Sequence, residues 1–246
     1  MTVPIYPRYR NRLTEQRSHE LAVEENPRNA AATSSGGRKK RSLAVTSRLW
    51  QPGRTLWISF LGAPERSLKM AIFELASEWV DLSGANLELD LAEDDDSRAQ
   101  IRVLTGPDAQ FNESDIGTDA LDHEDYTISL TVTPDHPYFK YVVLHEFGHA
   151  LGCQHEHQHP DADIPWNEAV AVPHYMQSQD WTEEEVKAQV LGKYNPSGLV
   201  KTEYDRTSIM HYYIPPEFIL GDWDMKPNVE LSEKDLEFMR LAYPHD

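Results

Sequence analysis

Three histidines in one short segment could hold a metal ion. His145 and His149 are four residues apart in a segment of helical periodicity, so both side chains would lie on one helix face. Gly152 tolerates the left-handed conformation that would turn the chain and bring His155 to the same ion. Three neutral imidazoles leave a fourth zinc position open for water, which is the catalytic rather than the structural arrangement. The sequence therefore predicts one catalytic Zn²⁺ ion.

Glu146 follows the first of these histidines and can project beside the metal without binding it. Such a carboxylate can accept a proton from a zinc-activated water and pass it to a leaving amine. A helix with ordinary surface histidines is the alternative interpretation. The glycine and the third histidine argue against it, because each further fixed position cuts chance matches about tenfold. We therefore interpret the segment as a catalytic metal site with Glu146 beside the ion.

Other potential ligands lie close to this segment. His157 and His159 directly follow the third histidine, but no helical or turn geometry aims them at the ion, so we expect them to be loop residues. Cys153 lies between two predicted ligands. A thiol in this place is better explained as a small apolar side chain packed under the turn, since free cysteines are among the most buried residues.

A second motif, Ser208-Ile209-Met210-His211-Tyr212, follows about fifty residues later. With the histidine segment and the glutamate after it, Glu156, it resembles the astacin family of metzincin zinc metallopeptidases, which pairs His-Glu-x-x-His-x-x-Gly-x-x-His-Glu with a Met-turn of the form Ser-x-Met-His-Tyr. The resemblance covers about residues 49–246 and is closest over 141–168 and 204–243, where two segments are similar to the bacterial and fungal branch of the family.

The resemblance implies a role for each matching residue. His145, His149 and His155 would bind zinc, Glu146 would be the general base, and Met210 would form an apolar floor beneath the metal. Tyr212 is similar to the tyrosine that ligates zinc at rest and swings away to support the transition state. Glu156 matches the glutamate that meets the new N-terminus of the processed enzyme. The implied activity is that of a zinc metalloendopeptidase acting on proteins or peptides.

The elements that must position these residues are visible in the periodicity. Strands are expected at 56–60, 87–91, 101–103 and 128–132, and helices between Pro64 and Gly84 and from Pro137 to Leu151. Two more helices should begin at Thr182 and Ser232, each followed three residues later by an acidic residue. We predict an α+β fold of the metzincin type. Its N-terminal lobe (about 47–152) would hold a mixed twisted sheet and two long helices, and its irregular C-terminal lobe (about 153–246) would end in a helix.

Residues 1–46 have a different composition from the rest of the chain. They carry nine Lys and Arg against four Glu, a net charge of +5, whereas the remainder carries −23. No apolar period persists in this segment, which predicts a disordered basic arm. The run Arg38-Lys39-Lys40-Arg41 is either a solvated charged stretch or a cleavage site that would release residues 1–41 as a pro-segment. The arm contains no Asp and no Cys, so the aspartate that silences zinc in some astacin pro-segments has no counterpart.

Composition excludes several classes of function. The acidic body disfavours nucleic acid and anionic membranes, and no apolar run is long enough for membrane insertion. The single cysteine cannot form an intrachain disulfide, unlike the disulfides of secreted animal astacins. The resemblance implies an extracellular protein, but the first residues include no apolar stretch of signal-peptide length. The sequence does not indicate an oligomeric state.

Three alternatives remain open at this stage. A matrixin-like or snapalysin-like metzincin would lack the tyrosine at position 212. A non-catalytic zinc-binding protein of the same fold, acting as a binding module, would not need Glu146. A toxin or effector delivered to another cell would differ in location but not in chemistry. We also expect the substrate to pair as an extended strand with residues 127–132, the cleanest strand signal in the chain.

Overall fold

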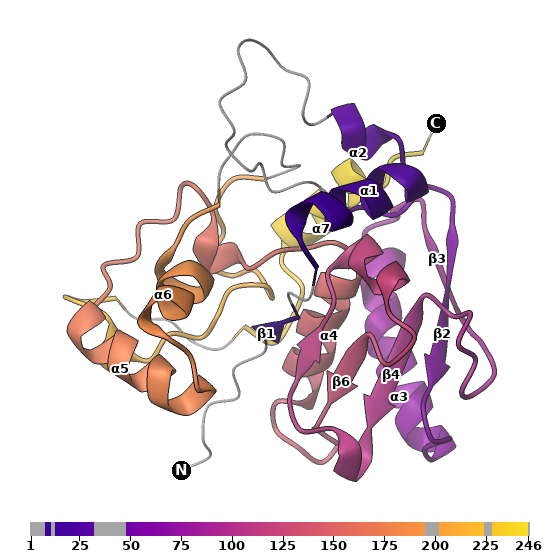
Figure 1. Ribbon diagram of the computed structural model, residues 1–246, viewed down its shortest axis with the longest axis horizontal. Helices are drawn as coiled ribbons and strands as arrows, with labels where there is room; N and C mark the ends of the chain where they lie inside the picture. The colour runs from indigo at the N-terminus through magenta and orange to yellow at the C-terminus, as the bar shows by residue number, and fades with distance from the viewer. Residues whose placement is uncertain (1–7, 11–12, 32–47, 195–201, 224–227, 246) are drawn as a thin grey trace.

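The computed structural model describes residues 8–10, 13–31, 48–194, 202–223 and 228–245. It is an α+β structure with a mixed sheet, two helices packed on that sheet and a less regular C-terminal lobe (Figure 1). The predicted fold class is confirmed. The strands are β1 (Arg8–Tyr9), β2 (Thr55–Phe60), β3 (Glu88–Leu91), β4 (Ile101–Thr105), β5 (Glu113–Ser114) and β6 (Ile128–Leu130).

The sheet has the strand order β1-β5-β6-β4-β2-β3. Strands β3, β2, β4 and β6 are parallel to one another, whereas β5 is antiparallel to β6 and β1 is parallel to β5. Parallel neighbours need crossover connections, and a helix usually supplies the crossover. Here α3 (Arg66–Asp81) connects β2 to β3.

Two helices pack against each other and against the sheet: α3 and α4 (Phe139–Ala150). Ile72, Ala76 and Trp79 of α3 are fully buried. Every side chain of α4 except that of Lys140 is buried, so this helix passes through the core rather than over its surface. The core formed by these two helices and the sheet extends to Met210 and to Met239 and Tyr243 near the C-terminus.

The described part of the C-terminal lobe includes the α-helices α5 (Glu168–Gln179), α6 (Glu183–Val186) and α7 (Glu233–Ala242). Capping boxes start α6 at Thr182 and α7 at Ser232, as predicted. Helix α5 was not expected, because Pro173 lies inside it and the surrounding sequence reads as irregular. A second apolar cluster joins α5 and α6 to Tyr212 and Phe218.

The prediction of a disordered N-terminal arm is wrong for the described part of that segment. Residues 15–25 form α1 (Glu15–Glu25) and residues 28–31 form α2 (Arg28–Ala31). Few apolar residues hold them, since α1 buries only Ser18, Leu21 and Ala22. Polar contacts also attach these helices to the rest of the chain. Asn26 and Asn29 donate to the carbonyl oxygens of residues 50 and 49, respectively, at 2.9 Å. The basic run 38–41 lies outside the described residues.

The predicted substrate-binding strand is also wrong in its position. Residues 128–130 form β6, which is an inner strand paired with β4 on one side and with β5 on the other. The alternation of apolar and polar residues suggested a strand with one exposed face, but Ser129 is as buried as its apolar neighbours. Beyond β6, the antiparallel strand at this side of the sheet is β5, which is too short to produce a periodic signal. The outer side of β5 is covered by β1.

Candidate active site

Helix α4 is anchored at its C-terminal end by side chains from distant parts of the chain. The last carbonyl groups of a helix have no partner inside it. Here the Trp50 indole N–H donates to the Ala150 carbonyl at 2.8 Å, and the Tyr243 hydroxyl donates to the Leu151 carbonyl at 2.8 Å. Halfway along the helix, the Trp79 indole N–H donates to the Leu144 carbonyl at 2.9 Å. These bonds fix the helix that carries the first two predicted ligands.

The three predicted metal ligands converge. One nitrogen atom from each of His145, His149 and His155 lies within 4.8 Å of the others, and all three residues are buried. The Nε2 atoms of His149 and His155 are 3.0 Å apart. Nε2 of His145 is buried and hydrogen-bonds to no residue that the structure describes. Buried ring nitrogens normally have a hydrogen-bond partner. Three imidazole nitrogens that converge in this way form a donor set that suits a metal ion.

Backbone carbonyl groups orient two of these rings. Nδ1 of His145 lies 2.9 Å from the Ile209 carbonyl oxygen, and Nδ1 of His149 lies 2.9 Å from the Cys153 carbonyl oxygen. With the proton on Nδ1, each ring donates to a carbonyl and keeps the Nε2 lone pair for a metal ion. His145, His149 and His155 therefore suit a divalent ion such as Zn²⁺.

Burial also keeps the imidazoles uncharged. It lowers the pKa of His149 to about 4 and the pKa of both His145 and His155 well below the usual value, with neighbouring imidazoles adding to the effect in these last two. Neutral imidazole is the form that binds metal, so no proton has to leave these rings at neutral pH.

The turn after α4 is made as predicted. Gly152 has φ +89°, in the left-handed region that favours glycine. A Cβ atom there would lie 2.9 Å from a methyl carbon of Leu49, so the turn is also tightly packed. Cys153 is buried in the core beside this turn, in agreement with its predicted packing role.

Met210 lies directly against the ligand-bearing helix. It is 3% exposed, and a Cβ atom placed on Gly148 of α4 would be only 2.3 Å from its sulfur. The same Cβ atom would lie 2.8 Å from the Trp79 ring. Glycine at 148 thus lets the turn that contains Met210 pack against the backbone of α4, between the two histidines.

We expect Gly148→Ala to lower the free energy of unfolding by about 1–3 kcal/mol, because the added methyl group overpacks this contact. Thermal unfolding should show a melting temperature several degrees lower. In a Met210→Ala background the same change should cost less, since one of the two clashing side chains is gone. Equal costs in the two backgrounds would show that the contact does not limit this position.

Tyr212 lies beside the three histidines, and Glu146 is on the same helix as two of them. Glu146 is fully buried on α4, between the first two ligands in sequence. The Tyr212 ring centre lies 4.3 Å from that of His155 and 6.0 Å from that of His145. The three histidines and Tyr212 therefore form one cluster, with Met210 packed against α4 beside it.

His157 belongs to the same cluster, which the sequence did not indicate. Its ring stacks on Tyr212 with centres 4.2 Å apart and an interplanar angle of 20°, and it is 2% exposed. His159 instead lies away from the metal ligands, with Nε2 3.2 Å from the Thr202 carbonyl oxygen. The expectation that His157 is an ordinary loop residue is therefore wrong. No spacing rule could have placed it, because a short 3₁₀ turn (Glu156–Gln158) sets its direction.

Comparisons with known proteins agree with this geometry. A family model for the astacin peptidases matches residues 89–218, which is more than half of the chain. The chain belongs to the astacin family. Astacins are zinc metalloendopeptidases, and the histidine cluster found here is positioned to hold their metal ion.

Solved astacin structures share the fold. A structure of myroilysin is 29% identical, with a TM-score of 0.72, and the match covers 81% of this chain and 97% of that one. A second myroilysin crystal structure, also 29% identical, has a TM-score of 0.60 over 88% of this chain and 96% of that one. High choriolytic enzyme 1, a hatching enzyme zinc-protease from the medaka fish Oryzias latipes, is 17% identical with a TM-score of 0.53, covering 85% and 98%, and shows the fold alone. No curated protein matches the sequence.

In this astacin, the Met-turn is held by the C-terminal helix. The Asp235 carboxylate of α7 accepts hydrogen bonds from the Ser208 hydroxyl at 2.6 Å and from the Ile209 N–H at 2.9 Å. The carbonyl of Ile209 then contacts the ring of His145. Asp235 therefore supports a predicted metal ligand through a single residue, Ile209. The sequence indicated Asp235 only as part of a capping box, a role that it also has.

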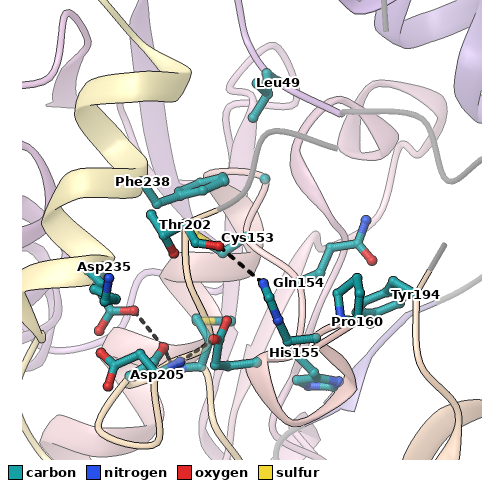
Figure 2. A pocket seen from close by; sticks show the side chains of 16 residues that line it. Leu49, Cys153, Gln154, His155, Pro160, Tyr194, Thr202, Asp205, Asp235 and Phe238 are labelled. Atoms are coloured by element: carbon teal, nitrogen blue, oxygen red, sulfur yellow. Dashed lines mark hydrogen bonds between the residues drawn. The ribbon is translucent and has the colours of Figure 1, made fainter. Parts of the chain in front are cut away.

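A pocket of about 80 Å³ opens beside the third ligand. Figure 2 shows Asp205 and Asp235 on one side of it, Pro160 and Tyr194 on the other, and His155 between them. Glu156 also lines this pocket and accepts a hydrogen bond from the Asp205 N–H at 2.7 Å. Burial raises the pKa of Glu156 to about 8, so an added positive charge in the pocket would stabilise its ionised form.

No helix among the described residues has the length and apolar character needed to cross a lipid bilayer.

Proposed function

We propose that this astacin hydrolyses internal peptide bonds of proteins with a zinc ion held by His145, His149 and His155. The convergence of one nitrogen from each of these buried, neutral rings carries the proposal. A bound zinc ion supplies Lewis acidity and lowers the pKa of a water molecule toward about 7. The chain supplies the other steps through Glu146 and Tyr212.

We assign Glu146 as general base and Tyr212 as a hydrogen-bond donor. Glu146 lies one residue after the first ligand on the same helix, is fully buried, and does not belong to the convergent nitrogen set. It accepts the proton of the attacking water and transfers it to the leaving amine. The hydroxyl of Tyr212 donates to the substrate carbonyl oxygen as negative charge develops there. Stacking on His157 limits the directions in which the Tyr212 ring can move.

Removal of the metal tests this proposal. The purified full chain should contain one zinc ion per molecule by elemental analysis and should cleave casein or a quenched fluorescent peptide. Treatment with 1,10-phenanthroline should abolish cleavage, and added zinc should restore it. A chain that holds zinc stoichiometrically but cleaves no peptide in a broad library would be a binding protein of the same fold and would refute the enzymatic assignment.

We further propose that residues 1–41 are a pro-segment. In the described chain β1 covers the outer side of β5, where an extended peptide would pair. Leu49 lines the pocket of Glu156 and lies only seven residues after Ser42, so the ammonium group of a chain beginning at Ser42 could reach that carboxyl group. The new N-terminus would add a positive charge to this pocket, whose lining already includes Lys234.

Processing of the natural protein should therefore accompany activity. Mass spectrometry of the active enzyme should show a chain that begins near Ser42, and specific cleavage after Arg41 should raise the hydrolysis rate. Glu156→Gln should reduce that gain, because the ammonium group loses its partner. Active enzyme with residue 1 intact would contradict the proposal.

A further inference from the structure

An arginine side chain is buried at the outer edge of the sheet. Arg10 follows β1, and its N–H donates to the Ser114 carbonyl oxygen of β5 at 2.7 Å, so the pairing of the two strands extends to it. Its side chain is only 2% exposed. Arginine is rarely buried unless specific partners compensate for the lost hydration, so the surroundings of this side chain are informative.

The guanidinium group occupies a pocket made by two segments of the chain. It lies over the Tyr126 ring, 4.0 Å from the ring centre, and donates to the Tyr126 carbonyl oxygen. It donates to an Asp125 carboxylate oxygen at 3.2 Å. The carboxylates of Asp115 and Glu113 lie 3.7 and 3.9 Å from Nε. Ring stacking and several acceptors around the group suit a flat guanidinium better than a lysine ammonium group.

Several other charged side chains surround the Arg10 guanidinium group. Asp115, Glu113 and Asp125 bring three carboxylates, and Arg102 is a second cation that interacts with two of them. The Arg102 side chain already donates to the carbonyl oxygens of residues 99, 123 and 125 at 2.6–2.7 Å. His123 also approaches Asp115, at 3.7 Å. Loss of Arg10 would remove a cation from beside two buried carboxylates, Asp115 and Glu113, which is costly.

The pocket lies where an extended substrate would bind. Both β1 and β5 contact α4, the helix that carries His145 and His149. In Figure 1, β1 lies between α4 and the lobe that contains α6. Addition of a strand to a sheet edge uses backbone hydrogen bonds for affinity and side-chain pockets for specificity. Arg10 is an arginine at the end of such an added strand, and its side chain is held at this edge.

We propose that the pocket formed by Glu113, Asp115, Asp125 and Tyr126 is a specificity subsite for an arginine side chain of the protein substrate. Arg10 fills this subsite as long as residues 8–10 remain on β5. The inference rests on the proposed peptidase function, because it names the substrate feature that the enzyme selects. It predicts that the protein prefers substrates with an arginine side chain once residues 8–10 have been displaced from β5.

Peptide binding to the full-length chain tests the proposal without turnover. The protein carries Glu146→Gln to prevent cleavage and Arg10→Pro, which removes both the guanidinium group and the N–H that bonds to Ser114. The probes are two fluorescein-labelled peptides of residues 6–14 with Arg8→Gln and Arg12→Gln; one keeps Arg10 and the other has Arg10→Gln. Fluorescence anisotropy should show at least about tenfold tighter binding of the arginine peptide, given a charge-assisted contact.

Substitutions in the pocket test whether its carboxylates cause the difference in affinity between the two peptides. Adding Asp115→Asn or Glu113→Gln should bring the two affinities within about threefold of each other, whereas Asp90→Asn on β3, at the opposite edge of the sheet, should leave the preference intact. If Asp115→Asn does not fold, Glu113→Gln alone decides. Equal binding of the two peptides, or a preference that survives loss of the pocket carboxylates, would overturn the subsite. Absence of cleavage by the protein with Glu146 intact, alongside a retained arginine preference, would refute the peptidase function and not the subsite.

Discussion

Replacing Glu146 with glutamine should leave zinc bound and reduce peptide hydrolysis by about 10²–10⁴-fold, close to the limit of detection. The amide of glutamine has nearly the shape of the carboxylate but cannot accept a proton from water. The three ligand nitrogens come from other side chains, so the metal site should persist. Initial rates on a fluorescent peptide, with zinc content measured on the same preparation, check both parts of the expectation.

The matched control for this variant is Glu184→Gln, which makes the same chemical change at an exposed position of α6. It should retain normal rates and metal content. Near-normal hydrolysis by the Glu146→Gln enzyme would refute the assignment of the general base. Loss of zinc from that variant would instead mean that Glu146 helps to hold the metal.

Replacing Tyr212 with phenylalanine should lower kcat by about 10²–10³-fold and leave KM nearly unchanged. The ring would still stack on His157 and pack near His155, so the shape of the site is kept. Only the hydroxyl is lost, and its hydrogen bond strengthens as the substrate carbonyl oxygen becomes negative. An interaction made mainly in the transition state affects kcat rather than KM when substrate binding equilibrates rapidly.

Tyr213→Phe is the neighbouring control, because it removes a hydroxyl from the next, half-buried residue. Full steady-state curves for both variants separate kcat from KM. An effect of Tyr212→Phe that is confined to KM would place the hydroxyl in substrate binding alone. The same rate for both variants would remove Tyr212 from the reaction.

The sequence predicted the metal cluster because its geometry is local. His145 and His149 are one helical turn apart, and one glycine brings His155 back toward them, so spacing alone defines the arrangement. The strands β2, β3, β4 and β6 and the helices α3 and α4 were predicted for the same reason, since their side chains repeat with a clear period. Tyr212 and Met210 came only from the resemblance to a family. Nothing in their spacing relates them to a helix about sixty residues earlier.

What the sequence did not predict depends on contacts between distant segments. Helix α1 buries few apolar side chains, and the segment is held mainly by polar bonds that composition does not show. Strand β5 has two residues, too few for any periodicity. Arg10 and its acidic partners are more than a hundred residues apart, and only the fold brings them together. His157 owes its place on Tyr212 to a short turn.

The bond between Asp235 and the Met-turn has a consequence for the order in which the protein can mature. The supporting carboxylate comes well after His155 in the chain, so it leaves the ribosome later than every one of the three imidazoles. A nascent chain that has exposed those rings still lacks the group that holds Ile209 against the first of them. Tight metal loading should therefore wait until α7 has been synthesised, and trimming of that helix by another protease should release the ion.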